Sequence, residues 1–237
     1  MERLFNALLQ ADLRAAELGR PLVTLAYAQS LDGCLTVERG RPTPLSGSEA
    51  LRLTHRLRAA HEGILVGVGA VVADNPQLNV RLAQGASPRP LVLDTQLRIP
   101  LDAGLVVREE NKPWILCSSA AAQSDTAGRL RACGCQVLGC ELDAQGRVSM
   151  REALRKIGEL GLQSVMIEGG AGVITSALKQ RLFDLAVITI RPVWLGGLGA
   201  VQAGLGEAGR WPALVDVQYE PCGQDLVVWG KAAEVEL

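Results

Sequence analysis

The spacing of apolar residues changes several times along the chain, and each change predicts a new element. Across residues 3–18 apolar side chains recur at steps of four, three, four and three residues, which predicts an amphipathic helix. Gly19 and Pro21 then act as stop signals. The stretch PLVTLAYAQSLDG (21–33) alternates loosely between apolar and small residues and ends in Asp-Gly, which is typical of a central strand.

Short apolar runs and helical patterns alternate through the middle of the chain. Two capping-box pairs, each a serine with a glutamate three residues later, mark helix starts. An Asn-Pro turn is expected within 70–81. An alternation of this kind usually gives parallel strands joined by right-handed crossovers. The capping pairs are Ser46 with Glu49 and Ser149 with Glu152, the helices are expected at 47–60, 120–132 and after 149, and the strands at 63–69, 89–95, 113–119, 135–142 and 164–168.

The pattern changes in the last quarter of the chain. Residues 185–197 are expected to form a strand, and 214–230 contain two apolar runs joined by Pro-Cys-Gly-Gln, which predicts a hairpin. We therefore expect an N-terminal helix within 1–20 and a single α/β domain over 21–237. Its sheet should be largely parallel, flanked by helices, with a C-terminal antiparallel hairpin.

Composition and charge narrow the class of protein. The 237 residues are 48% hydrophobic and 21% charged, as in an ordinary globular protein. The 24 basic and 25 acidic residues nearly balance, so the net charge creates no overall electric field that would attract nucleic acid or a membrane. An anionic ligand must therefore be held by a few local arginines. The six cysteines form no CxxC motif and lie far in sequence from His55 and His61, so no metal site is expected. No long apolar run occurs, and the N-terminus lacks an apolar signal core, so we expect a cytoplasmic protein.

The run SVMIEGGAGVITSAL (164–178) combines a buried strand, an acid, two glycines and a helix start. Gly169 and Gly170 would leave backbone N–H groups open to a phosphate at the helix N-terminus, although they could also make only a tight connection. The carboxylate of Glu168 needs a partner at the end of an apolar strand, either N–H donors of a ligand or a protein arginine. An internal ion pair that held Glu168 away from any cleft would contradict a role in catalysis.

Other glycines and acids follow strands in the same way. Gly196-Gly197 comes after the strand that starts at 185, and two glycine-rich strand exits would suit a ligand with a pyrophosphate, although a wide turn is the simpler alternative. Gly67-x-Gly69 lacks the third glycine of a dinucleotide fingerprint, because Val72 stands in its place. Asp32 and Asp74 also lie just beyond strand-like segments, where a carboxylate often caps its own backbone.

Few residues offer covalent chemistry. The chain has no GxSxG and no HExxH motif, so hydrolysis by a catalytic triad or by a metal is not expected. Hydride transfer needs less from the protein, which has mainly to hold a nicotinamide against an electrophilic carbon. Among the arginines, Arg56 is expected on a salt-bridged solvent face of the helix over 47–60, and Arg58 lies near the loops. Arg81, beside Asn79, is our first choice for a phosphate contact.

Five stretches in order resemble the riboflavin-biosynthesis reductase family over about residues 20–230. They are SLDG (30–33), HRLRAAHEGILVGVGAVVADNPQLNVR (55–81), RPLVLD (89–94), MIEGGAG (166–172) and RPVWLGG (191–197). The resemblance implies a dihydrofolate-reductase-like fold and reduction, by NADPH, of the ribosylamino side chain of a diaminopyrimidinone 5′-phosphate to the ribitylamino form. It also implies a homodimer.

The resemblance implies roles for individual residues. Asp32 and Glu168 would be catalytic, with Glu168 near the pyrimidine. The remaining positions fall into a substrate group (Ser30, Arg58, Asn79, Arg81) and a cofactor group (Asp74, Gly67, Gly169, Gly170, Gly196, Gly197).

The chain departs from the family pattern at three positions. Cys34 stands where many members have a lysine or arginine, Ala70 where a threonine often contacts the nucleotide, and Pro44 near an aromatic position of two-domain relatives. The deaminase motif that often precedes this reductase is missing. A reductase of a pterin or another cyclic imine, and a silent nucleotide-binding module, are the alternatives.

Overall fold

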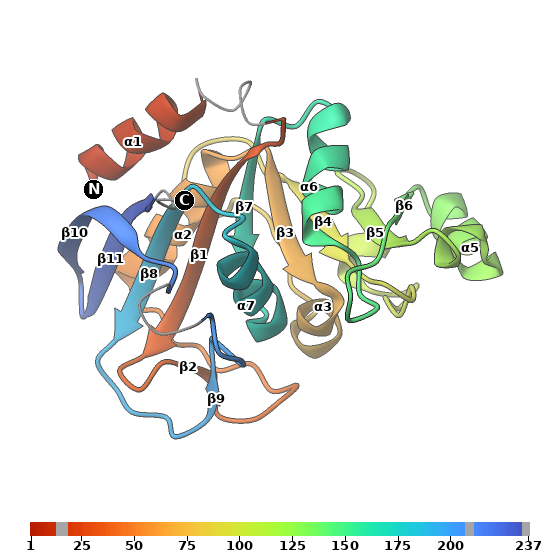
Figure 1. Ribbon diagram of the computed structural model, residues 1–237. Helices are drawn as coiled ribbons and strands as arrows, with labels where there is room; N and C mark the ends of the chain where they lie inside the picture. The colour runs from red at the N-terminus through yellow and green to blue at the C-terminus, as the bar shows by residue number, and fades with distance from the viewer. Residues whose placement is uncertain (13–18, 207–210, 234–237) are drawn as a thin grey trace.

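The computed structural model describes residues 1–12, 19–206 and 211–233. Within these residues, nine strands form one sheet in the order β10-β11-β8-β1-β7-β3-β4-β5-β6, and β2 pairs with β9 in a second, two-stranded sheet (Figure 1). The strands are β1 Leu22–Ser30, β2 Cys34–Thr36, β3 Gly63–Gly67, β4 Arg89–Leu93, β5 Trp114–Ser118, β6 Gln136–Cys140, β7 Ser164–Glu168, β8 Leu185–Arg191, β9 Leu198–Gly199, β10 Leu214–Cys222 and β11 Asp225–Ala232.

The strands from β8 to β6 are parallel to one another, and the C-terminal hairpin adds the antiparallel pairings of this sheet at one edge. β11 pairs antiparallel with β8, and β10 pairs antiparallel with β11. The α/β fold with a largely parallel sheet and a final antiparallel hairpin, expected from the alternation of elements, is therefore confirmed.

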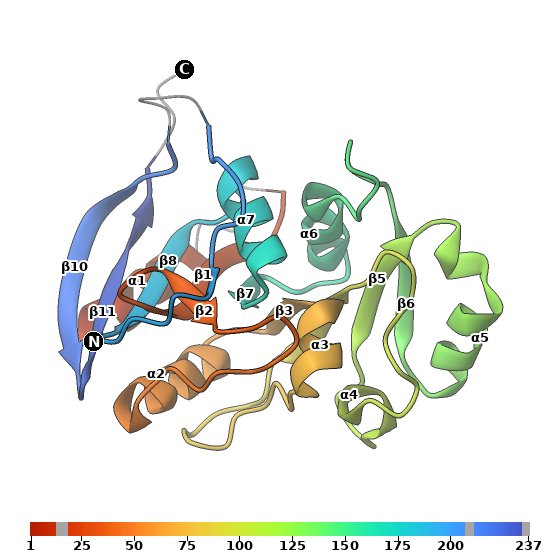
Figure 2. The same cartoon turned by 90° about the horizontal axis from the view of Figure 1, so that it is seen from below.

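Helices cover both faces of the large sheet (Figure 2). On one face, α6 and α7 pack their apolar residues against strands at the centre. On the other face, α1 and α2 pack over β1, β7 and β8, while α3, α4 and α5 pack over β3 to β6. The helices are α1 Glu2–Asp12, α2 Ser48–Ala59, α3 Val68–Asp74, α4 Gly104–Val107, α5 Asp125–Ala132, α6 Met150–Glu159 and α7 Ala171–Gln180, with a short 3-10 turn η2 at Ala121–Gln123.

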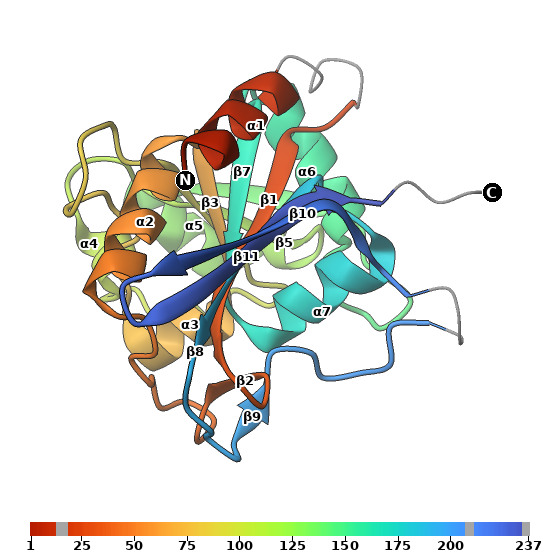
Figure 3. The same cartoon turned by 90° about the vertical axis from the view of Figure 1, so that its left-hand side faces the viewer.

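The N-terminal helix lies beside the C-terminal hairpin (Figure 3). Leu4 and Leu8 are buried with Trp229 of β11, and the N-terminal amine pairs with Glu220 of β10. The predicted helix over 3–18 thus corresponds to α1 as far as residue 12, and its predicted continuation over 13–18 lies outside the described residues.

Three local predictions were wrong. The strand expected over 185–197 ends at Arg191. The strand expected over 63–69 ends at Gly67, because Val68 begins α3, which also occupies the start of the expected turn region. The capping box of Ser46 with Glu49 does not form. Gly47 is the N-cap of α2, and its N–H donates to the buried Asp225 carboxylate at 2.7 Å.

The second capping box is confirmed at its serine. Ser149 caps α6, and its Oγ accepts from the Glu152 N–H. The side chain of Glu152 instead pairs with Arg155. The reciprocal half of this capping box is therefore replaced by an ion pair between residues three apart within α6.

Candidate active site

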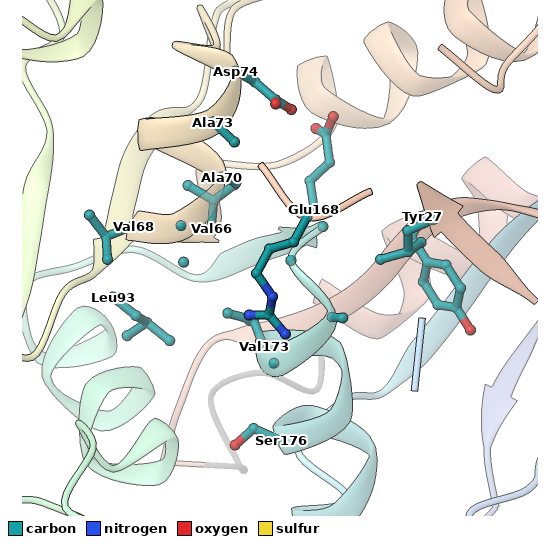
Figure 4. A pocket seen from close by; sticks show the side chains of 18 of the residues that line it. Tyr27, Val66, Val68, Ala70, Ala73, Asp74, Leu93, Glu168, Val173 and Ser176 are labelled. Atoms are coloured by element: carbon teal, nitrogen blue, oxygen red, sulfur yellow. The ribbon is translucent and has the colours of Figure 1, made fainter. Parts of the chain in front are cut away.

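The carboxyl ends of the parallel strands open into a cleft of about 890 Å³. Its walls come from the ends of β1, β3, β4 and β7, the first turns of α3 and α7, and the loops after β2 and β6. Figure 4 shows Ala70, Ala73 and Asp74 on α3 beside Glu168, with Leu93 and Val173 further along the wall. Ligands of open α/β sheets collect at this edge, because the loops there leave backbone groups unpaired.

A glycine gap forms the middle of the cleft. Gly170 is the N-cap of α7 with φ 79°, and no side chain caps that helix end. A Cβ on Gly170 would lie 4.0 Å from the backbone N of Gly67, so the exits of β7 and β3 are adjacent. A Cβ on Gly67 would lie 3.0 Å from Val173 Cγ2, which explains a glycine there. The predicted Gly67, Gly169 and Gly170 all line the cleft.

Glu168, at the end of β7, is paired with Arg58 of α2. Arg58 Nε donates to Glu168 Oε2 at 2.8 Å, and Nη2 donates to Oε1, which is a bidentate pair. Both residues line the cleft, and the side chains are 9% and 22% exposed. The arginine that the sequence left open is therefore Arg58. Since each carboxylate oxygen has a second lone pair, the cleft side of Glu168 can still accept from a ligand.

The same arginine fixes the segment that follows α3. Arg58 Nη1 donates to the Asn79 carbonyl at 3.0 Å, and Asn79 Oδ1 accepts from Arg81 Nη1 at 3.2 Å. His55 is fully buried, and its Nδ1 accepts from the Arg81 N–H at 3.1 Å. Among the described residues, its Nε2 has no hydrogen-bond partner. The structure thus brings Arg58, Asn79 and Arg81 together, but of the three only Arg58 is among the described residues that line the cleft.

The charge state of His55 follows from its surroundings. Burial, with Arg58 and Arg81 nearby, lowers the pKa of His55, so the imidazole is neutral near pH 7. A neutral ring can accept the Arg81 N–H, which a doubly protonated ring cannot do. His55 therefore has a positioning role, which the sequence did not indicate because this histidine was considered there only as a possible metal ligand.

Asp32 belongs to a second unit beside the cleft. Its carboxylate accepts from Ser30 Oγ, from the Gly196 N–H at 2.7 Å and from the Leu195 N–H at 3.1 Å. These bonds, with that of Ser30 the strongest, hold the pKa of Asp32 well below its usual range. The group is therefore ionised at any physiological pH, with its oxygens committed to the loop after β8.

Gly197 has a packing role in the same unit. A Cβ there would overlap the Thr36 carbonyl oxygen and lie 2.7 Å from Val37 Cα, so the two loops approach closely. Ser30, Asp32, Gly196 and Gly197 are not among the described residues that line the cleft, whereas the neighbouring Gly199 is. The two predicted glycine pairs are thus separate in space, and only Gly169-Gly170 faces the cleft.

Asp74 lies on α3 at the rim of the cleft (Figure 4). Loss of hydration raises the pKa of its carboxyl group. Its neighbour Asn75 has a left-handed φ of 41° and accepts the Gly104 N–H through Oδ1 at 2.8 Å, which fixes the turn after α3.

Several cleft residues were absent from the sequence-based set. They come from the loops after β2, β4 and β6, and the rule that ligands meet the ends of parallel strands would have found the last two groups. No group of three or more potential metal ligands occurs in the described ranges. No helix there is both long and apolar enough to cross a membrane. The additional polar residues that line the cleft are Thr36, Arg39, Arg41, Thr43, Thr95, Gln96, Arg98, Asp143 and Arg147, with Tyr27 from β1, Ser176 from α7 and Gln202 from the segment after β9.

The sheet order, the cleft at the strand ends and the final hairpin define an α/β protein of the dihydrofolate-reductase-like class. The chain belongs to the RibD C-terminal domain family, whose model matches residues 21–228.

Named relatives are similar over most of the chain. A 2,5-diamino-6-ribosylamino-4(3H)-pyrimidinone 5′-phosphate reductase of Debaryomyces hansenii is 35% identical over 235 residues, which cover 88% of each chain. The protein of that name from Eremothecium gossypii is 38% identical over 192 residues, 76% of each chain. The riboflavin biosynthesis protein RibD of Aquifex aeolicus is 32% identical over 90% of this chain, which spans 58% of that relative.

Solved structures share the fold. RibD of Acinetobacter baumannii superposes with a TM-score of 0.81 at 24% identity, covering 95% of this chain and 62% of the other. The riboflavin biosynthesis reductase Rib7 of Saccharomyces cerevisiae superposes with a TM-score of 0.71 at 29% identity, covering 91% of each chain. The resemblance to the riboflavin-biosynthesis reductases is therefore confirmed.

Proposed function

We propose that this protein is an NADPH-dependent reductase that converts the ribosylamino side chain of 2,5-diamino-6-ribosylamino-4(3H)-pyrimidinone 5′-phosphate to the ribitylamino form. The observation that carries the proposal is the Glu168–Arg58 pair in the wall of the cleft, directly beside the glycine gap of Gly169 and Gly170. Relatives that bear the name of this activity match most of their length to the chain, which supports the substrate class.

The residues of the gap fit a dinucleotide. Gly169 and Gly170 would let a pyrophosphate approach the N-terminus of α7, which lines the cleft and has no side-chain cap. Gly67 and Asp74 would border the same group from α3. When it is bound, the dinucleotide supplies the hydride.

The reaction itself needs orientation more than covalent chemistry. In the open, imine form of the substrate, a hydride adds to C1′ and a proton to the attached nitrogen, so that C=N becomes C–N. We assign Glu168 to the N–H donors of the pyrimidine, because its carboxylate is held in place by Arg58 on the other side. Asn79 and Arg81 would meet the 5′-phosphate at the end of the same network.

Asp32 takes a different part in this proposal from the one the resemblance implied. A carboxylate with four donors, the Cys34 thiol included, and a depressed pKa has no proton to give near pH 7, so water is the better proton source. Asp32 and Ser30 would instead position the loop that carries Gly196 and Gly197 against the β2–β9 end of the cleft.

The proposal is tested by following NADPH oxidation with the phosphorylated substrate, and then with its dephosphorylated form. We expect turnover with the first, and a rise in KM of about 10- to 100-fold without the phosphate. In Arg81→Ala the two substrates should differ much less. Equal rates for both substrates in the wild-type protein would favour a pterin or other imine reductase. Cofactor binding without oxidation of NADPH would favour a silent module.

We further infer a homodimer in the cytoplasm. β10 is an edge strand of the large sheet, and Tyr219 on it is 68% exposed, as expected of a surface that a second copy could cover. All six cysteines are free thiols, which suits a reducing compartment. Light scattering on the purified protein would give the mass, and a monomer at micromolar concentration would contradict the dimer.

A further inference from the structure

One buried carboxylate joins the C-terminal hairpin to two other elements. Asp225 is the first residue of β11, directly after the hairpin turn, and its side chain is fully buried. Its Oδ2 accepts the Gly47 N–H at 2.7 Å, and its Oδ1 accepts from Arg191 Nη1 at 3.1 Å. Because Gly47 is the N-cap of α2 and Arg191 ends β8, this acid connects the hairpin turn to both (Figure 2).

The hairpin turn and the start of α2 approach each other closely around this acid. A Cβ on Gly47 would lie 3.1 Å from Asp225 Oδ2, and a Cβ on Gly223, in the hairpin turn, would overlap the Glu49 carboxylate. Gly47 has no side chain with which to cap α2 itself. The Asp225 carboxylate therefore supplies, from the hairpin, the acceptor and the negative charge that stabilise the start of a helix.

The other end of α2 carries the contacts that organise the substrate side of the site. Arg58 makes the bidentate pair with Glu168 and donates to the Asn79 carbonyl. His55, on the same helix, accepts the Arg81 N–H. Since backbone hydrogen bonds make a helix of this length move as one unit, a displacement of its first turn also displaces these two side chains.

We propose that Asp225 is a positioning residue of the reductase, which holds α2 in the place where Arg58 and His55 order the substrate side of the site. Its partners lie on α2 and β8, whereas the glycine gap proposed for the dinucleotide lies at the exits of β3 and β7. Loss of this acid therefore affects the pyrimidine far more than the dinucleotide. The inference rests on the proposed function, because it assumes that the pyrimidine lies against Glu168.

The chain offers a matched control at the opposite end of β8. Asp184 directly precedes this strand, and its Oδ2 accepts from the Val23 N–H and from Arg20 Nη1, each at 2.7 Å. Asp184 thus also bonds one backbone N–H and one arginine, but it lies at the amino ends of the parallel strands, whereas the cleft lies at their carboxyl ends. Asp184→Ala and Asp225→Ala remove similar contacts from different places.

The test is steady-state kinetics with NADPH and the phosphorylated pyrimidine, together with calorimetric titration of NADP⁺. We expect Asp225→Ala to lower kcat/KM about 10- to 100-fold, because small displacements of orienting groups are costly, and to keep the Kd for NADP⁺ within about 3-fold. Asp225→Asn should stay within about 5-fold of the wild-type kcat/KM, since its amide oxygen can still accept the Gly47 N–H. Asp184→Ala should lose stability in urea but keep kcat/KM within about 3-fold.

Amide hydrogen exchange gives a second readout, which does not depend on turnover. The Arg81 N–H should exchange about 10-fold faster in Asp225→Ala than in the wild type, and at the wild-type rate in Asp184→Ala, because only the first variant releases α2. If Asp225→Ala does not fold, Gly47→Ala tests the same contact, since its Cβ would crowd the carboxylate. It should lower kcat/KM in the same direction.

Two results would overturn the inference: wild-type kinetics in a folded Asp225→Ala or Gly47→Ala protein, or equal kinetic losses in Asp225→Ala and Asp184→Ala. If the wild-type protein reduces the pyrimidine while either result is found, the proposed function stands without this positioning residue. If no pyrimidine is reduced but exchange of the Arg81 N–H responds to Asp225 alone, the positioning of α2 stands and the proposed function fails.

Discussion

This protein has two acid–glycine units, and only one of them faces the cleft. The first is Glu168 with Gly169-Gly170 at the exit of β7, and the second is Asp32 with Gly196-Gly197 near the exit of β8. In the first, the acid is paired with an arginine side chain. In the second, it accepts the N–H groups of the glycine loop itself.

The partner of the acid decides what each unit can do. Arg58 neutralises Glu168 and leaves the N–H groups at the start of α7 without a side-chain partner, so a ligand can use both the acid and the helix end. Asp32 uses the N–H groups of Leu195 and Gly196, so little remains for a phosphate. The Glu168 unit can therefore bind a ligand, whereas the Asp32 unit holds two loops together.

The largest expected difference between the units is in turnover. Glu168→Ala should lower kcat/KM for the phosphorylated pyrimidine by about 10²- to 10³-fold, because an oriented polar partner of the reacting heterocycle is lost. Asp32→Ala should cost less than about 10-fold, since this carboxylate acts through the loop. Steady-state kinetics with NADPH measure both, and NADP⁺ affinity should be retained in Glu168→Ala.

A control is needed because Glu168→Ala leaves the buried guanidinium of Arg58 without its ion-pair partner, which can cost about 3 kcal/mol of stability. Urea unfolding of both variants will show whether the protein stays folded at assay temperature, and Glu168→Gln keeps the side-chain volume. Equal kinetic losses in the Glu168 and Asp32 variants, with both folded, would contradict the division of roles.

A smaller difference is expected in the packing of the glycines. Gly197→Ala should lower the free energy of unfolding by about 2 to 3 kcal/mol, because its Cβ would overlap the Thr36 carbonyl. Gly172→Ala, in the first turn of α7, meets no atom within 4 Å and should raise it by up to about 1 kcal/mol. Urea denaturation of the two variants measures both changes in the free energy of unfolding. A Gly197→Ala variant as stable as the wild type would contradict the close approach of the loops.

The smallest expected effect concerns pH. The folded-state pKa of Asp32 is depressed, so its ionised form contributes stability above the unfolded pKa near 3.8, and that contribution is lost as the pH falls below this value. Asp32→Asn should therefore be less stable than the wild type at pH 6, and the gap should narrow by pH 3. Urea midpoints at the two pH values measure it. A gap that is the same at both would show that the carboxylate is not held by the loop.

Much of the fold follows from local sequence patterns. The strands β4 to β8, the hairpin and the glycine exits were predictable, because apolar runs bounded by turn residues specify buried parallel strands. The helix α3 was not, since Val68 to Val72 continues the apolar run of β3 and only the tertiary structure ends the strand at Gly67. The cap of α2 also depends on Asp225, which lies 178 residues away in the sequence.

The site was predictable only in part. The spacing of residues gave Glu168 and its glycines, but it could not tell that Arg58 pairs with this acid across 110 residues. Nor could it separate Gly169-Gly170 from Gly196-Gly197, because both follow apolar strands and only contacts distant in sequence distinguish them. The sequence did not predict that Arg98 and Arg147 line the cleft, because their loops become neighbours only when β4 and β6 join the same sheet.

The central claim, that the cleft at the exit of β7 holds a nicotinamide dinucleotide, is tested most directly by filling it. Gly172 lines the cleft and Gly128 lies on the exposed side of α5, and a Cβ at either position would meet no atom within 4 Å. The measurement is the Kd for NADP⁺ of Gly172→Leu and Gly128→Leu, with thermal unfolding as the check that both are folded. We predict that Gly172→Leu weakens binding by at least about 100-fold, through loss of helix N–H and charge contacts, while Gly128→Leu binds like the wild type. Undiminished binding of NADP⁺ to Gly172→Leu would contradict the account.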